Sequence, residues 1–120
     1  MDRLEQIARK HACKSTGKNI HVSLLVIRNK VISWGRNSYE KTHPRGGKNR
    51  LYFVHSELNC ITRFNFRENK ISRATLYNFR FSKKDSGLLL AAPCENCIQL
   101  CTAFGIRKIK FSTPYGMCEL

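Results

Sequence analysis

The sequence predicts an α/β fold with three layers (α/β/α), in which a central mixed sheet of about four or five strands lies between helices. Its 120 residues suit one small domain over residues 1–120. Apolar runs of strand length alternate with stretches of helical spacing, without an internal repeat, low-complexity tract or linker. This alternation indicates that part of the sheet is parallel.

One helix and a hairpin are predicted at the start of the chain. Apolar residues recur at helical spacing over Asp2–Ser15, and Gly17 stands where that helix would end. Ile20–Arg28 is a nearly continuous apolar run, which predicts a buried strand. Val31–Trp34 follows a short turn, so it predicts a second strand paired with the first.

The rest of the chain predicts a long loop over residues 36–51, then two helices and three strands. Loops of that length in compact domains are often functional. The elements after it are a helix over Phe53–Phe66, strands over Ala74–Phe81 and Leu88–Ala91, a helix over Cys94–Phe104 and a last strand over Ile106–Phe111.

The segment after Phe111 is short. We expect it to be a mobile tail that includes Cys118, which leaves the sheet with a short edge. Such an edge can be covered by another subunit, so we expect that an oligomer can form there.

The charge balance points to an anionic partner. Lys and Arg number 22 against 8 Asp and Glu, which gives a formal net charge of +14. Nucleic acid is the commonest large anion that such a surface meets. The plainer alternative is a solvated basic surface that has no partner.

The composition also predicts where the protein works. No apolar run approaches the roughly 20 residues of a membrane helix, and the charged start lacks the apolar stretch of a signal peptide. We therefore expect a cytoplasmic or nuclear protein that is not secreted and has no membrane partner. In that setting the six cysteines are expected to be reduced, and some of them can be metal ligands.

Two short motifs carry the chemistry. His55-Ser56-Glu57 opens one predicted helix, and Pro93-Cys94-Glu95-Asn96-Cys97 opens another. A catalytic zinc takes three protein ligands and keeps a fourth position for water, so His55, Cys94 and Cys97 could fill the three. Glu57 could reach that water without binding the metal, and zinc lowers the pKa of bound water toward about 7.

Two other interpretations of these motifs are open. A purely structural zinc normally has four protein ligands, and Cys60, Cys101 or Cys118 could be the fourth. The Cys-x-x-Cys pair alone could also be a redox pair. The presence of both motifs in order, each at a predicted helix start, favours the catalytic zinc site.

His-x-Glu followed by Pro-Cys-x-x-Cys is the signature of zinc deaminases, so the chain resembles the cytidine deaminase superfamily. The resemblance extends from Asp2 to about Ser112 through the order of the predicted elements. It implies a cytidine-deaminase-like fold, one zinc ion per chain and hydrolytic loss of the exocyclic amine of a nucleobase, with Glu57 carrying the proton. It further implies that Asn37 holds the sugar or base, and that backbone groups at Ser56 and Ala92 read the base edge.

The resemblance favours cytosine over adenine. His55–Asn59 is similar to the His-Ala-Glu-x-Asn run of deoxycytidylate deaminases, and residues 74–77 are similar to short phage-type cytosine deaminases. The expected substrate is cytosine in single-stranded nucleic acid, which needs a basic groove and rings for flanking bases. Tyr115 is the candidate ring, and the candidate phosphate contacts are Arg36, Lys41, Arg45, Lys48 and Arg50.

Three other functions stay open at this point. The first is a deaminase of a free nucleotide or nucleoside (dCMP or cytidine), because one phosphate needs only a few basic groups. The second is an adenosine deaminase that acts on RNA. The third is a non-catalytic nucleic-acid-binding protein that keeps zinc as a scaffold, although such a protein has no need of Glu57.

Overall fold

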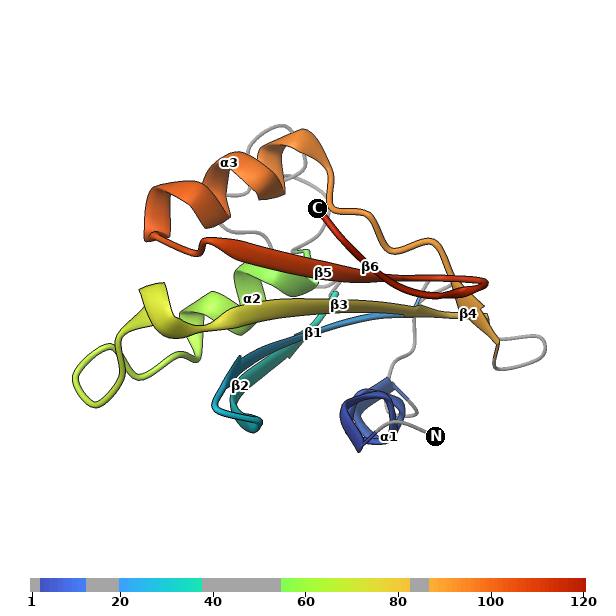
Figure 1. Ribbon diagram of the computed structural model, residues 1–120, viewed down its shortest axis with the longest axis horizontal. Helices are drawn as coiled ribbons and strands as arrows, with labels where there is room; N and C mark the ends of the chain where they lie inside the picture. Colours follow the sequence, from blue (N-terminus) through green and yellow to red (C-terminus); the bar gives the residue numbers. More distant parts are fainter. Residues whose placement is uncertain (1–2, 13–19, 38–54, 83–86) are drawn as a thin grey trace.

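A computed structural model describes residues 3–12, 20–37, 55–82 and 87–120, and these residues form three layers (Figure 1). A single sheet of six strands has the order β2-β1-β3-β5-β6, with β4 paired to β3. The elements are α1 (Arg3–Ala12), β1 (Ile20–Ile27), β2 (Lys30–Arg36), α2 (Ser56–Thr62), a 3-10 turn (Ile71–Arg73), β3 (Thr75–Phe81), β4 (Leu88–Leu89), α3 (Glu95–Phe104), β5 (Lys108–Thr113) and β6 (Gly116–Glu119).

The predicted fold class is confirmed, and the sheet is mixed. β1 pairs antiparallel with β2 and with β3, whereas β3 and β5 run parallel. The β1–β2 turn contains Arg28 and Asn29, both at positive φ (51° and 63°), as in the tight turns that match the twist of a hairpin. Among the described helices, none is long and apolar enough to cross a bilayer.

Each face of the sheet has its own core. On one face, Leu4 and Ala8 of α1 pack against Leu24 of β1 and Phe79 of β3. On the other face, α2 and α3 cover a second cluster, whose buried members are Leu25, Cys60, Ile61, Phe64, Ala74, Leu76, Cys101, Ile106 and Ile109. Because successive strand residues point to opposite faces, the residues next to Leu24 and Phe79 along the chain face α2 and α3.

The end of the chain differs from its prediction. The residues expected as a mobile tail form β6, which pairs antiparallel with β5 and places Cys118 opposite Phe111. Gly116 permits the reversal with a φ of 133°, and the Thr113 hydroxyl donates to the Gly116 carbonyl at 2.8 Å. The sheet therefore has six strands, where about four or five were expected. Assembly through this edge stays a prediction.

Helix boundaries also differ from their prediction. The described part of the predicted helix Phe53–Phe66 is helical only over Ser56–Thr62. Beyond it, the Asn65 side chain accepts hydrogen bonds from the backbone N–H of Arg67 at 3.0 Å and of Glu68 at 3.3 Å. Such a local turn competes with the helix and ends it.

α2 lies directly on β2 at Gly35. A Cβ atom built on Gly35 would stand 2.6 Å from the Ser56 carbonyl oxygen and 2.8 Å from the Asn59 carbonyl carbon, and it would also meet the Cys60 amide nitrogen. All three are backbone atoms of α2, so they can yield only if the whole helix moves. This close approach fixes the height of α2 above the sheet.

We expect Gly35→Ala to lower the free energy of unfolding by about 1–3 kcal/mol, because the added methyl group overpacks this contact. Urea unfolding measures the change. Gly116→Ala is the matched control, since its added Cβ meets nothing within 4 Å and reports only the cost of a positive φ. Equal losses in the two variants would contradict the steric explanation.

Candidate metal centre

Two helix starts meet above the sheet. His55 and Cys94 directly precede α2 and α3, and both have extended backbones (φ −70° and ψ 152°, φ −70° and ψ 164°). Their carbonyl groups accept the first helical hydrogen bonds, from Asn59 at 3.1 Å and Ile98 at 3.0 Å. Within the described residues neither side chain caps its own helix, so the imidazole and the thiol are directed elsewhere.

The three predicted ligands converge. One ligand atom each from His55, Cys94 and Cys97 lies within 4.8 Å of the others. The His55 Nδ1 atom is 3.0 Å from the Cys97 sulfur and 3.7 Å from the Cys94 sulfur. Zinc with bonds of about 2.3 Å to sulfur and about 2.0 Å to nitrogen in a tetrahedron separates such atoms by about 3.6 Å. The two measured distances bracket this value.

The charge balance of the cluster also fits a cation. Burial raises the pKa of the Cys97 thiol, and the negative charge of Glu57 raises it further. A thiolate at this position therefore needs a nearby positive charge, which a divalent ion supplies. Cys94 is the N-cap of α3 and Cys97 lies in its first turn, where the helix dipole also favours thiolate. The residues present therefore fit zinc.

The other described cysteines lie elsewhere. Cys60 and Cys101 are fully buried in the core cluster beneath α2 and α3, and burial raises the pKa of each thiol to about 12. Cys118 is exposed on β6. The ligand cluster among the described residues thus has three members, which is the number of protein ligands that a catalytic zinc takes.

Glu57 is held in the first turn of α2 and is only 6% exposed. Its Oε2 atom accepts a hydrogen bond from the Asn78 amide at 3.0 Å. Its Oε1 atom accepts one from the Ser56 hydroxyl at 3.2 Å. A buried carboxylate is stable only with such partners, and these two donors hold it beside the metal ligands.

Sequence reasoning missed several polar residues on the strands beneath this site. Ser23 and Asn78 are buried cross-strand partners in β1 and β3, and His21 and Arg80 are the next pair. Burial lowers the pKa of His21, and the Glu57 carboxylate opposes this shift. The signal in the sequence is the polar residue at every second position, which interrupts two otherwise apolar strands.

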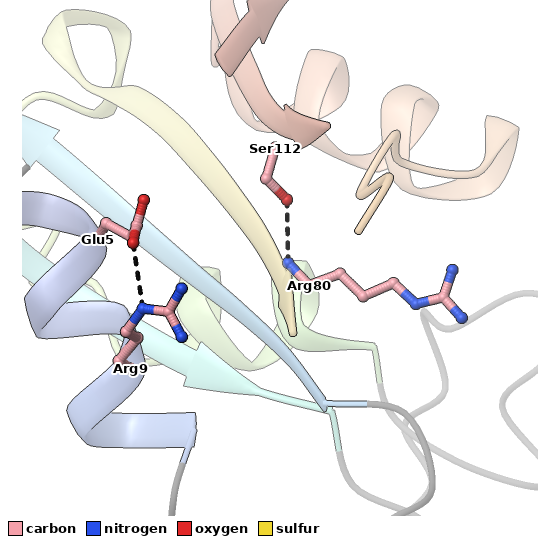
Figure 2. Close-up of polar contacts among 4 residues, drawn as sticks. All are labelled: Glu5, Arg9, Arg80 and Ser112. Carbon is pink, nitrogen blue, oxygen red and sulfur yellow. Dashed lines mark hydrogen bonds and ion pairs between the residues drawn. The ribbon is translucent and has the colours of Figure 1, made fainter. Parts of the chain in front are cut away.

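Arg80 is the outermost of these polar residues on β3. Its backbone N–H donates to the Ser112 hydroxyl at 3.1 Å, and that hydroxyl donates to the Leu89 carbonyl at 2.7 Å, so β3, β4 and β5 are joined. Figure 2 shows the Arg80 side chain extending away from α1, where Glu5 and Arg9 form an ion pair of 3.1 Å. Arg80 therefore belongs to the face that carries Asn78.

The predicted substrate residues are spread around the centre. Asn37 follows β2, where its N–H donates to the His21 carbonyl and its Oδ1 accepts the His21 N–H, both at 3.2 Å. Ser56 is buried in α2, and Ala92 is exposed just before α3. Tyr115 is 99% exposed in the β5–β6 turn.

The predicted phosphate contacts are only partly described. The Arg36 guanidinium lies 5.6 Å from the centroid of Trp34, and the Arg63 guanidinium is 4.1 Å from the same ring. Trp34 pairs with Leu24 and lies with it on the face of the sheet that α1 covers. Because the Arg36 guanidinium lies over Trp34, it is directed away from Glu57, which lies on the other face. Lys41, Arg45, Lys48 and Arg50 lie outside the described residues.

We expect Cys97→Ser to lower zinc content well below one ion per chain and to reduce thermal stability, because metal binding is coupled to folding. Cys101→Ala is the matched control, since it also removes a buried α3 thiol but lies outside the ligand cluster. Metal analysis of the purified variants measures both. Normal zinc content in Cys97→Ser, or its loss in Cys101→Ala, would contradict the assigned ligands.

We expect Cys60 and Cys101 to resist alkylation at pH 9 in the folded protein, because their raised pKa keeps both thiols protonated. The unfolded chain loses these protons above about pH 8.5, so stability falls as the pH rises from there toward 12. Mass spectrometry after alkylation measures the reactivity, with exposed Cys118 as the internal reference. Equal labelling of Cys101 and Cys118 in the native state would refute this expectation.

The chain matches a family and several solved structures. Residues 1–113 match the family described as the cytidine and deoxycytidylate deaminase zinc-binding region. No curated protein matches the chain in sequence. A cytidine deaminase from Mycobacterium leprae has 16% identity and a TM-score of 0.60, over 99% of this chain and 94% of that one.

Two structures of a dCMP deaminase from the cyanophage S-TIM5 are also similar. The complex with dCMP and dUMP has 14% identity and a TM-score of 0.54, over 92% of this chain and 82% of that one. The apo form has 15% identity and a TM-score of 0.52, over 94% and 86%. The solved structures support the fold, and the family match covers nearly the whole chain. The chain therefore belongs to the zinc-binding cytidine and deoxycytidylate deaminase family.

Proposed function

We propose that this protein hydrolyses cytosine to uracil and releases ammonia, with Glu57 as the catalytic residue. The observation that carries the proposal is a buried carboxylate in the same helical turn that follows His55, beside three side chains suited to one zinc ion. A bound zinc ion would supply Lewis-acid activation of water.

Glu57 moves the protons of this reaction. Its carboxylate takes a proton from the attacking water and delivers it to the ring nitrogen next to the amine. After the water oxygen has bonded to the ring carbon, the second water proton passes through the same group to the departing amine. The C–N bond then breaks, so one water and one cytosine yield one uracil and one ammonia.

The base is oriented by groups around the ligand cluster. We assign Asn37 to the sugar or the base, and the backbone groups at Ser56 and Ala92 to the base edge. The sequence positions of Ser56 and Ala92 support this assignment. Ser56 directly follows the ligand His55, and Ala92 lies two residues before the ligand Cys94. Asn37 supports it because its hydrogen bonds to the His21 backbone fix its position at the end of β2.

We favour single-stranded nucleic acid as the carrier of the cytosine. The net charge of +14 and the fully exposed ring of Tyr115 support this choice. In Figure 1, α2 and α3 begin above the middle of the sheet, and the β5–β6 turn that carries Tyr115 lies beyond both helix starts, at the tip of the sheet. An exposed ring at this end can stack on a base that flanks the target.

A free nucleotide is the second candidate, and specific observations favour it. Arg36 lies over Trp34 on the other face of the sheet, so it is not directed at the site. Arg67, Lys70 and Arg73 follow the end of α2 that is opposite to His55. The similar cyanophage enzyme binds dCMP and dUMP.

We expect Glu57→Gln to keep zinc and the fold but to lower turnover by about 10²–10⁴-fold, because an amide cannot carry the proton. Glu95→Gln is the matched control, since Glu95 lies in the first turn of α3 but is exposed. Uracil release from dCMP, cytidine and a cytosine-containing oligonucleotide measures turnover and identifies the carrier.

The outcomes of that experiment separate the functions. Release from the oligonucleotide alone supports the polymer substrate, whereas release from dCMP or cytidine alone supports the second candidate. Inosine formation from RNA would replace cytosine with adenine as the target. A zinc-loaded protein that releases ammonia from none of these substrates, yet binds single strands, would be a non-catalytic binder.

A further inference from the structure

A buried polar row lies on the sheet directly beneath Glu57. Ser23 in β1 is 0% exposed and Asn78 in β3 is 4% exposed, and the two residues are cross-strand partners. Their strand neighbours on the same face, Leu25 and Leu76, belong to the apolar core. Polar side chains at such positions are costly to bury unless every hydrogen-bonding group has a partner.

The partners of this row are specific. Asn78 donates from Nδ2 to the Glu57 Oε2 atom at 3.0 Å. The Ser23 hydroxyl donates to Asn78 Oδ1 at 2.7 Å, and it lies 2.8 Å from the Ser56 hydroxyl. The Ser56 hydroxyl in turn lies 3.2 Å from Glu57 Oε1. Three polar side chains, Ser23, Ser56 and Asn78, therefore form a connected polar network around the Glu57 carboxylate.

Counting donors fixes the direction of the hydrogen bonds at Asn78. A carboxylate only accepts hydrogen bonds, so Asn78 must present its NH₂ group to Glu57 and its oxygen to Ser23. Ser23 has a single hydroxyl hydrogen, and Asn78 Oδ1 takes it. A flipped amide would place its oxygen against the carboxylate and its NH₂ group against Ser23. The Glu57 carboxylate therefore sets the orientation of the Asn78 amide, and the Ser23 hydroxyl supports it by donating to Oδ1.

We propose that Asn78 is a positioning residue, supported by the hydrogen bond from Ser23, that holds the Glu57 carboxylate in its reactive orientation. This inference rests on the proposed function, because it concerns the residue assigned to proton transfer. The Asn78 side chain bonds to a functional carboxylate and not to the backbone, so its effect falls on the geometry of Glu57. Misplacing a reacting group by about 1 Å can cost about 10²-fold in rate.

The test compares paired variants of the zinc-loaded protein. We expect Asn78→Ala to lower kcat by about 10²-fold while KM changes by less than about threefold, because orientation and not binding is lost. Ser23→Ala leaves the amide in place but removes the donor to its Oδ1 atom, so we expect a smaller fall in kcat of about tenfold. Zinc content stays at one ion per chain in both variants.

Each variant has a structural control. Asn59→Ala removes an α2 amide that donates to the Arg36 carbonyl, and Ser33→Ala removes a buried hydroxyl that donates to the Cys60 carbonyl at 2.9 Å. Each control removes one hydrogen bond between α2 and β2 but keeps the Gly35 contact and every partner of Glu57, so kcat should stay within about threefold of the unaltered protein. Equal kcat losses in a variant and its control would overturn the proposal. If Asn78→Ala does not fold, the comparison of Ser23→Ala with Ser33→Ala decides.

A structural readout separates this inference from the proposed function. Crystal structures of zinc-loaded Asn78→Ala and Asn59→Ala should show the Glu57 carboxylate rotated only in the first. An unrotated carboxylate in Asn78→Ala would overturn the positioning role even if the protein is an active deaminase. Conversely, a protein without deaminase activity would refute the proposed function, while the rotation would still show that Asn78 orients Glu57.

Discussion

The geometry of the site depends on how closely α2 lies on β2. Gly35 lets the helix backbone touch the strand, and this steric contact sets the height of α2 above the sheet. His55 and Glu57 lie at the start of this helix, so their positions follow from that contact. A helix only seven residues long has little stability of its own, and packing must hold it in place.

The same placement buries negative charge, which the surroundings have to balance. Glu57 is buried near the Cys97 thiol. The pKa of this thiol is raised by burial and, further, by the Glu57 carboxylate. Hydrogen bonds from Asn78 and Ser56 stabilise the carboxylate, but they supply no net positive charge. A divalent ion held by His55, Cys94 and Cys97 would provide it, so metal binding would offset the negative charge buried at this site.

The sequence predicted the site residues that lie close together along the chain. It missed those that only the pairing of distant strands brings together. The spacing of Cys94 and Cys97 within one helical turn makes two ligands visible from the sequence alone. Asn78 meets Glu57 only because β1 and β3 pair in one register, and a shift of one residue would turn its side chain to the α1 face. β6 was missed because its exposed residues show no apolar alternation, and the turn at Gly116 defines it.

The large positive charge is a weaker argument for a polymer than its size suggests. Several described cations lie over aromatic rings, which stabilise a cation: Arg9 over Phe81, Arg36 and Arg63 over Trp34, and Lys110 over Tyr77. Arg9 is also paired with Glu5. These groups contribute to the net charge but not to a groove beside Glu57. The choice between polymer and nucleotide therefore depends on cations near the site. Arg80 is one of them, because it lies on the Glu57 face of β3 and its charge acts on His21.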